Sequence, residues 1–149
     1  MARELYLVDS NVLMRWVQPG DPGFSVAEAS IESLERSRDI PCYVSQNLGE
    51  FWNALTRPTN RNGYGLLPRN ADALATIMET KFRLLHDTPA VHYEWRKILV
   101  DYRVSGVQVH DARLVAAMHV HGVKRILTFN AKDFTRFDDI EAVHPLDIS

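Results

Sequence analysis

The sequence predicts an α/β protein, a three-layer α/β/α sandwich around a mostly parallel sheet of about five short strands. Short apolar runs such as residues 5–8 are continuous rather than alternating, as is typical of parallel strands that are covered on both faces. Helical segments alternate with these runs along the chain, which is the order that builds helix layers on both sides of a sheet. The 149 residues contain no repeat or linker, so we expect a single domain, residues 1–149.

The composition is that of an ordinary globular protein, with 46% hydrophobic and 24% charged residues. The formal charge of −2, from 17 basic and 19 acidic residues, excludes a broadly basic nucleic-acid coat but leaves room for a local basic groove. The single cysteine, Cys42, has no partner for an internal disulfide, which favours a reducing compartment. Because no apolar run is long enough to cross a bilayer and no signal segment precedes the first strand, we expect a cytoplasmic protein without membrane contact.

The first half of the chain is expected to contain two strands and three helices. The apolar run that begins the chain ends in Asp9, and a Pro- and Gly-rich cluster at 19–23 ends the short helix after it. Ser45 is expected to cap the third helix, whose apolar residues recur at helical spacing. The expected strands are 5–8 and 42–44, and the expected helices are 12–17, 26–36 and one that runs from the Ser45 cap to about residue 56.

The second half is expected to continue the alternation. Residues 57–67 form a loop that is locally basic, and Pro68 and Pro89 lie in the first turns of two helices. Asp111 begins a further helix that Gly122 ends. The expected helices are 68–82, 90–102 and 111–118, and the expected strands are 84–85, 126–129 and an edge strand at 141–143.

Four acidic side chains occupy equivalent places in this alternation. Asp9 ends the first strand, Glu50 lies early in the helix after the second strand, Asp111 begins a helix, and Asp133 follows the fourth strand. Asn130 lies three residues before Asp133. Because parallel strands end at one edge of a sheet, where ligands of such folds bind, these side chains are expected to converge.

Converging carboxylates repel one another unless a cation compensates their charge or some of them are protonated. Oxygen ligands alone favour a hard ion, Mg²⁺ or Mn²⁺, over zinc. Such an ion activates a water and neutralises the charge that develops on phosphorus during phosphodiester hydrolysis. The pattern therefore indicates a metal-assisted hydrolase that acts on phosphodiesters.

The same residues resemble the motifs of a known family, the PIN-domain ribonucleases. Residues 8–13 (VDSNVL) are similar to its first motif and residues 46–51 (QNLGEF) to its second, which is built around a helical glutamate. Residues 105–117 (SGVQVHDARLVAA) resemble the third motif, and residues 127–134 (LTFNAKDF) resemble the fourth. All four occur in order over nearly the whole chain, and the length and layout resemble the VapC-type toxins of prokaryotic toxin–antitoxin pairs.

The resemblance implies a PIN-like fold and an endoribonuclease that cuts single-stranded or loop RNA, leaving a 3′-hydroxyl and a 5′-phosphate. It implies that Asp9, Glu50, Asp111 and Asp133 are the catalytic and metal-binding acids, with Asn130 at a place where other members have aspartate or asparagine. Ser10 and Asn11 would support the site. Basic residues near the motifs are expected to bind RNA phosphates: Arg15, Arg57, Arg61, Arg113 and Lys132.

The resemblance also implies partners. The expected antitoxin is a small protein whose C-terminal segment lies in the acidic groove and brings a basic side chain to the metal site. We also expect a homodimer, because the helices carry more aromatic and aliphatic residues than five short strands can cover.

Other interpretations of these residues stay open at this stage. Asp9 and Asp111 are also typical helix caps, Glu50 is also an ordinary exposed helix residue, and Asp133 also suits a local turn. Asn130 in place of an acid supports a catalytically weak or inactive binding module. A phosphotransferase with an aspartate nucleophile is disfavoured, because such enzymes need a second acid two residues later, where this chain has Asn11.

Overall fold

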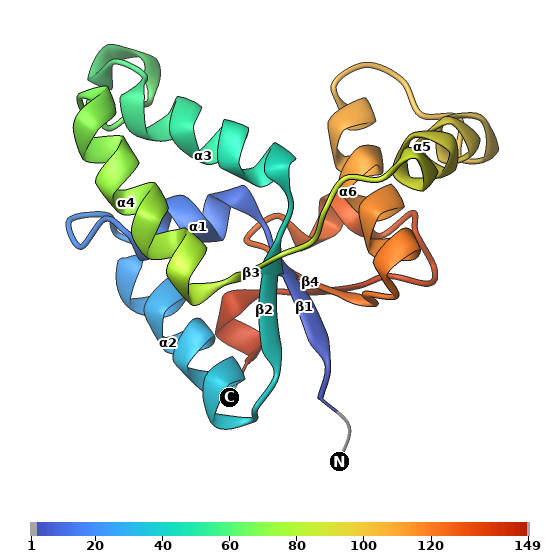
Figure 1. The fold of residues 1–149 in the computed structure, drawn as a ribbon, viewed down its shortest axis with the longest axis horizontal. Helices are drawn as coiled ribbons and strands as arrows, with labels where there is room; N and C mark the ends of the chain where they lie inside the picture. The colour runs from blue at the N-terminus through green and yellow to red at the C-terminus, as the bar shows by residue number, and fades with distance from the viewer. Residues whose placement is uncertain (1–2, 149) are drawn as a thin grey trace.

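The computed structural model describes residues 3–148 and contains a five-stranded sheet with strand order β3-β2-β1-β4-β5. All four strand pairings are parallel, so the predicted α/β fold is confirmed and its sheet is fully parallel within the described residues (Figure 1). The strands are β1 (Leu5–Val8), β2 (Ile40–Tyr43), β3 (Arg83–Leu84), β4 (Arg125–Leu127) and β5 (Glu141–Val143).

Strand β1 lies at the centre of the sheet because its residues are apolar on both faces. Leu7 packs into one hydrophobic cluster, whereas Tyr6 and Val8 pack into a second cluster on the other face. Burial of such side chains contributes about 25 cal/mol per Å² of apolar surface. Leu7 pairs with Cys42 of β2 and with Ile126 of β4, and all three are fully buried.

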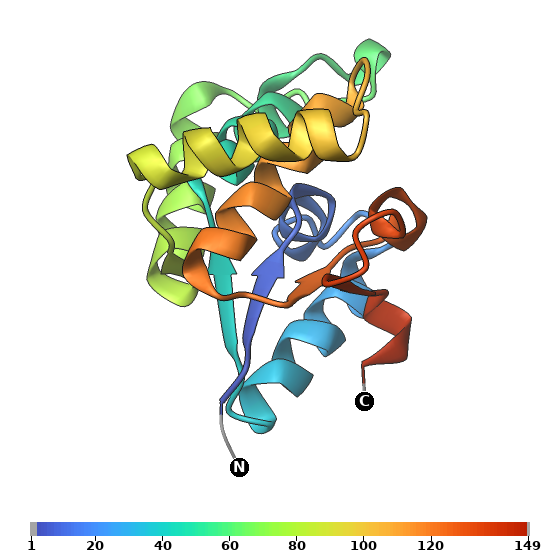
Figure 2. The same cartoon turned by 90° about the vertical axis from the view of Figure 1, so that its right-hand side faces the viewer.

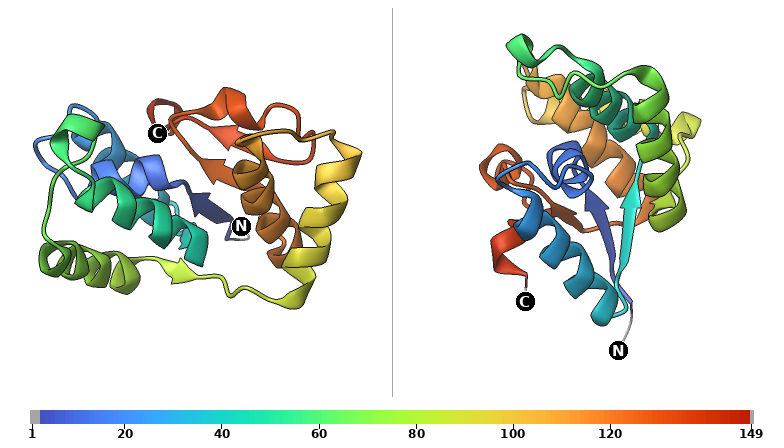
Figure 3. Two further views of the ribbon diagram at one scale, coloured as in Figure 1. Left: turned by 90° about the horizontal axis from the view of Figure 1, so that it is seen from above. Right: turned by 90° about the vertical axis from the view of Figure 1, so that its left-hand side faces the viewer.

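Within residues 3–148, six helices pack on the two faces of the sheet, and there are also three short 3₁₀ segments. Helices α1 to α4 pack on the face that carries Tyr6 and Val8, and α5 and α6 pack on the face that carries Leu7. Seen from above, β1 lies between these two groups (Figure 3), and Figure 2 shows α5 and α6 in front of the strands. The helices are α1 (Ser10–Trp16), α2 (Phe24–Arg36), α3 (Ser45–Thr56), α4 (Pro68–Lys81), α5 (Pro89–Asp101) and α6 (Gln108–His121), and the 3₁₀ segments are η1 (Thr59–Arg61), η2 (Ala131–Phe134) and η3 (Pro145–Asp147).

Several helix starts differ from the sequence prediction, and α2 and α5 begin at Phe24 and Pro89 where residues 26 and 90 were predicted. Helix α1 begins at Ser10, because Asp9 is its N-cap and accepts the backbone N–H of Ser10. Helix α3 includes Ser45, which was wrongly predicted as the cap; Val44 precedes the helix. Helix α6 begins at Gln108, so Asp111 lies in its first turn instead of opening it.

The remaining differences are small. Strand β4 ends at Leu127, two residues earlier than predicted, and β2 covers Ile40–Tyr43 where 42–44 was predicted. Cys42 is fully buried, and burial raises the pKa of its thiol to about 11, so it packs as a small hydrophobic residue. Between residues 3 and 148, no helix has the length and apolar character to span a bilayer.

Candidate active site

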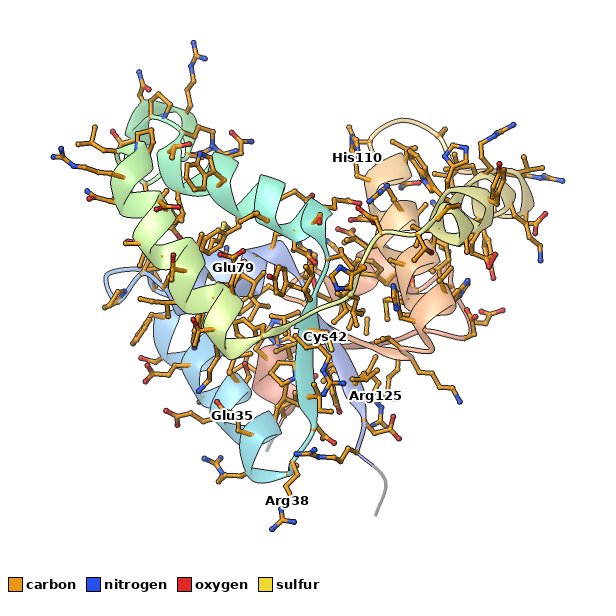
Figure 4. All side chains as sticks on the ribbon, viewed as in Figure 1. Glu35, Arg38, Cys42, Glu79, His110 and Arg125 are labelled. Atoms are coloured by element: carbon orange, nitrogen blue, oxygen red, sulfur yellow. The ribbon has the colours of Figure 1, made fainter. Side chains whose placement is uncertain are left out.

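A pocket of about 320 Å³ lies beyond the carboxyl ends of β1 and β4. Its walls come from the start of α1, one side of α3, the first turn of α6 and the residues after β4. In Figure 4, His110 in this turn of α6 lies beyond the carboxyl ends of the strands, whereas Arg125 lies near their amino ends. The pocket is lined by Asp9, Ser10, Asn11, Met14, Glu50, Asn53, Ala54, Arg57, Asp111 and Asn130.

Asp9 is a buried residue that lines this pocket, just after strand β1 ends. Its side chain accepts the backbone N–H of Ser10 at 2.8 Å and the Thr128 hydroxyl at 2.8 Å. Burial, with a smaller contribution from the charges of Glu50 and Asp133, raises the pKa of Asp9 to about 6, although the two hydrogen bonds act to lower it. Asp9 is therefore both the cap of α1 and a carboxyl group in an acidic pocket, so the capping interpretation is correct but incomplete.

Asp111 reaches the same pocket from the opposite helix layer. Burial, together with the charges of Asp9, Asp133 and Glu50, raises its pKa to about 6. The charges of Glu50 and Asp133 thus act on both Asp9 and Asp111, although the four acids are distant in sequence. Asp133, exposed in η2, contributes its charge but does not line the pocket.

Glu50 is an exposed residue on α3 that is held by a hydrogen bond. The Ser10 hydroxyl donates to Oε1 of Glu50 at 2.9 Å and accepts from the Asn47 amide at 3.1 Å. The bond joins the start of α1 to α3, across 40 residues of sequence. Glu50 is thus not an ordinary solvated helix residue.

The segment after β4 is organised by Asn11 and Thr128. The Asn11 side chain accepts the backbone N–H of Phe129 at 3.2 Å and donates to Thr128 Oγ1 at 3.3 Å. The same hydroxyl accepts the backbone N–H of Asn130 at 3.0 Å. These bonds place Asn130 at the pocket wall, next to the Asp9 end of the site.

The donors around the pocket fit a hard divalent ion, because they are carboxylate, hydroxyl and amide oxygens. Burial and the neighbouring acids disfavour the ionised forms of Asp9 and Asp111, and a bound cation would offset that cost. In the part of the chain that the structure describes, no three Asp, Glu, His or Cys side chains are grouped closely enough to hold an ion as they are placed.

Arg57 is the one predicted RNA-binding residue, of the five, that lines the pocket. It follows α3, and its guanidinium donates to the backbone carbonyl of Asn62 at 3.0 Å. Its Nε is buried and has no hydrogen-bond partner among residues 3–148. Arg61 and Lys132 are exposed and lie outside the pocket lining.

Arg15 and Arg113 make internal contacts instead of lining the pocket. Arg15 donates to the backbone carbonyl of Asn11 at 2.7 Å and lies 3.6 Å from Asp21. Arg113 lies 3.3 Å from Asp87 and bonds Gln46 at 3.4 Å.

Two residues of the site were not singled out from the sequence: Asn47 and Thr128. Both are fully buried and polar, and such groups need partners. A polar residue in a segment that is expected to be buried indicates that its side chain needs a hydrogen-bond partner. The partners of Asn47 and Thr128 could not be identified in this way, because they lie 37 and 119 residues away along the chain. Asn53, a further pocket residue, lies one helical turn after Glu50.

Comparison with known proteins gives one family and a set of similar folds. The family model of the PIN domain matches residues 6–140. A search of the curated proteins finds no match. Structural neighbours include VapC toxins of VapBC toxin–antitoxin systems.

The VapBC2 complex of Rickettsia felis, bound to promoter DNA, has a chain with a TM-score of 0.69 and 10% identity, covering 94% of this chain and 98% of that one. VapC20 of Mycobacterium tuberculosis, a toxin that cleaves the sarcin-ricin loop, has a TM-score of 0.66 and 24% identity, covering 90% and 95%. A chain of the DNA-bound VapBC of Salmonella typhimurium has a TM-score of 0.66 and 15% identity, covering 97% and 99%. At these identities the likeness establishes the fold. All four motifs lie within or beside one pocket. Because the family model spans most of the chain, the protein belongs to the PIN domain family.

Proposed function

We propose that the protein is a metal-dependent endoribonuclease. The observation that supports this most directly is the acidic pocket, in which burial and mutual repulsion raise the pKa of Asp9 and of Asp111 to about 6. Strongly perturbed carboxyl groups that share a cleft are typical of functional sites. Family membership and the fold likeness to VapC toxins point to the same reaction class.

The residues that would hold Mg²⁺ or Mn²⁺ are Asp9, Glu50, Asp111, Asp133 and Asn130. When bound, the ion supplies an activated water and positive charge for the phosphorus centre. The chain itself orients the acids: Thr128 and the Ser10 backbone hold Asp9, and the Ser10 hydroxyl holds Glu50. An amide at Asn130 adds no negative charge, so we expect weaker metal binding than with a fifth acid.

The proposed substrate is single-stranded or loop RNA, cut to give a 3′-hydroxyl and a 5′-phosphate. Arg57 lines the acidic pocket, which supports the proposal that it contacts a phosphate there. The exposed cations Arg61 and Lys132 are proposed to contact phosphates outside the pocket. Arg15 and Arg113 are proposed as weaker RNA contacts, because their guanidinium groups are already paired with Asp21 and Asp87.

We further propose that the protein is the toxin of a type II toxin–antitoxin pair and a homodimer in the cytoplasm. The support is the fold likeness to VapC chains that were solved with their antitoxins. The proposed antitoxin is a small protein that inserts a basic side chain into the acidic pocket. Coexpression with the protein encoded by the upstream neighbouring gene, followed by copurification and nuclease assay, tests this; a copurified neighbour that leaves cleavage unchanged contradicts it.

Cleavage of labelled RNA oligonucleotides in Mg²⁺, in Mn²⁺ and in EDTA tests the nuclease. We expect cleavage in either metal, none in EDTA, and none with Asp9→Asn. The control is Glu28→Gln, which removes an exposed acid of α2 outside the pocket and should cleave like the wild type. Activity that survives both chelation and Asp9→Asn contradicts the proposal.

The alternative from a different class is a PIN-fold binding module without catalytic activity, for which Asn130 is the favouring observation. Calorimetry separates the two. Absence of Mn²⁺ binding at millimolar metal, together with RNA binding that cleaves nothing, would establish the binding module instead.

A further inference from the structure

Asn47 occupies a place in α3 that helix formation alone does not explain. It is fully buried, in the first turn of the helix, and both ends of its amide make hydrogen bonds. Oδ1 accepts the backbone N–H of Val44 at 2.9 Å, and Nδ2 donates to the Ser10 hydroxyl at 3.1 Å. We propose that Asn47 is a positioning residue that directs the Ser10 hydroxyl toward Glu50 and thereby preorganises the metal site.

The orientation of the amide follows from its partners. The backbone N–H of Val44 can only donate, so the oxygen of the Asn47 amide must face it. The amide nitrogen must then face Ser10 and donate to its oxygen. The backbone at the start of α3 therefore determines which group is presented to Ser10.

The direction of the Ser10 hydroxyl follows in turn. A serine hydroxyl has one hydrogen to donate, and its oxygen is already accepting from Asn47. The hydrogen is left for Glu50 Oε1, 2.9 Å away. Asn47 thus donates a hydrogen bond to Ser10, and Ser10 donates one to Glu50. Without Asn47, nothing would direct the Ser10 hydroxyl hydrogen toward Glu50.

This order matters because Glu50 is exposed and has a long side chain with several rotamers. A donor that always points at one of its oxygens restricts those rotamers before an ion arrives. The second oxygen of Glu50, Oε2, does not accept this hydrogen bond and is therefore available to an ion. Partners that orient metal ligands in this way commonly change metal affinity or activity by about 10- to 100-fold when they are removed.

The inference rests on the proposed function, since it gives Asn47 a role only if Glu50 binds the ion. The test is calorimetric titration of folded protein with Mn²⁺, in wild type, Asn47→Ala, Ser10→Ala and the double variant. We expect each single variant to raise the Mn²⁺ dissociation constant about tenfold, and the double variant to be no weaker than Ser10→Ala alone. Asn70→Ala, an exposed residue of α4, is the control and should bind Mn²⁺ like the wild type.

RNA cleavage separates positioning from a loss of folded protein. We expect Asn47→Ala to raise the Mn²⁺ concentration for half-maximal cleavage by the same factor, with kcat at saturating Mn²⁺ within about twofold of wild type. A purely structural defect would instead lower kcat at every metal concentration, in proportion to the protein lost.

Asn47→Asp covers the case in which Asn47→Ala does not fold, because it keeps an acceptor for the Val44 N–H. It offers Ser10 a second carboxylate in place of a donor. Weaker Mn²⁺ binding by this variant supports the inference, since an added negative charge alone would strengthen binding. Binding equal to or tighter than wild type overturns it.

The two proposals fail differently. Wild-type protein that binds no Mn²⁺ at millimolar concentration contradicts the proposed function and the role of Asn47 together. Wild-type binding with an unchanged constant in Asn47→Ala, or with effects of Asn47→Ala and Ser10→Ala that multiply, overturns the role of Asn47 alone.

Discussion

Replacing Asp9 by asparagine is expected to abolish RNA cleavage and yet make the protein more stable at neutral pH. The carboxyl group is nearly the size of the amide, so the packing around it is kept. Its pKa rises from 3.8 to about 6 in the folded chain, chiefly through burial. Each pKa unit is worth about 1.4 kcal/mol, so holding the ionised group in the fold costs about 3 kcal/mol above pH 6.

The variant avoids this cost, but it loses a hydrogen bond, which offsets part of the gain in stability. The carboxylate accepts from the Ser10 backbone and from Thr128, and an amide can face only one of these donors with its oxygen. Losing one such bond costs about 1–2 kcal/mol. We therefore expect Asp9→Asn to raise the free energy of unfolding by about 1–2 kcal/mol at pH 7.5, or the Tm by about 2–4 °C for each kcal/mol.

The pH dependence is the more specific part of this prediction. Because the pKa of Asp9 is higher in the folded chain than in the unfolded chain, the folded state holds more protons between about pH 4 and 6. The wild type therefore loses stability as pH rises through that window, and Asp9→Asn lacks this contribution. The substitution should stabilise the protein by about 1–2 kcal/mol at pH 7.5 and destabilise it by about 1 kcal/mol near pH 4, where the lost hydrogen bond is the larger effect.

Thermal unfolding in EDTA, followed by circular dichroism from pH 4 to 7.5, measures the difference. Asp72→Asn, an exposed acid of α4, is the control and should show no such gain. A variant that is less stable than the wild type at pH 7.5, or a gain that is equal at pH 4 and 7.5, would refute the view that Asp9 is held at an energetic cost.

Four further outcomes are expected. Thr128→Val should lower the free energy of unfolding, measured by urea titration, by about 2 kcal/mol. The reason is that it leaves the N–H of Asn130 unpaired and removes a hydrogen-bond donor to Asp9. The control, Thr76→Val at an exposed position, should change the free energy of unfolding by less than about 0.5 kcal/mol. Gly63→Ala should be destabilising by more than about 2 kcal/mol, because a Cβ there would lie 1.9 Å from the backbone oxygen of Arg57; Gly20→Ala, which has open space, should be tolerated. Millimolar Mn²⁺ should raise the Tm of the wild type but not of Asp9→Asn, and an equal rise in both would contradict binding at Asp9. Light scattering at micromolar concentration should give twice the 17.0 kDa chain mass, and the mass of a single chain would contradict the proposed homodimer.

Local patterns in the chain were enough to predict the architecture and the approach of Asp9, Glu50 and Asp111 to one pocket, whereas Asp133 lies outside the pocket lining. A continuous apolar strand followed by Asp9 predicts a buried parallel strand whose carboxylate lies at the functional edge, and the structure places it there. The start of α6 was predicted three residues late, because Asp111 is a typical cap and the residues before it look like a loop. Helix ends depend on such local competition and are the least certain part of a prediction from sequence.

The sequence by itself determined the order of strands and helices and the types of ligand, because periodicity and side-chain chemistry are properties of nearby residues. Only the tertiary structure decided which polar groups hold the acids in place. Thr128 meets Asp9 across 119 residues, and Asn47 meets Ser10 across 37. It also decided that Arg57 lines the pocket while Arg15 pairs with Asp21. Such contacts depend on how segments that are distant in sequence pack together, and local sequence patterns do not predict that packing.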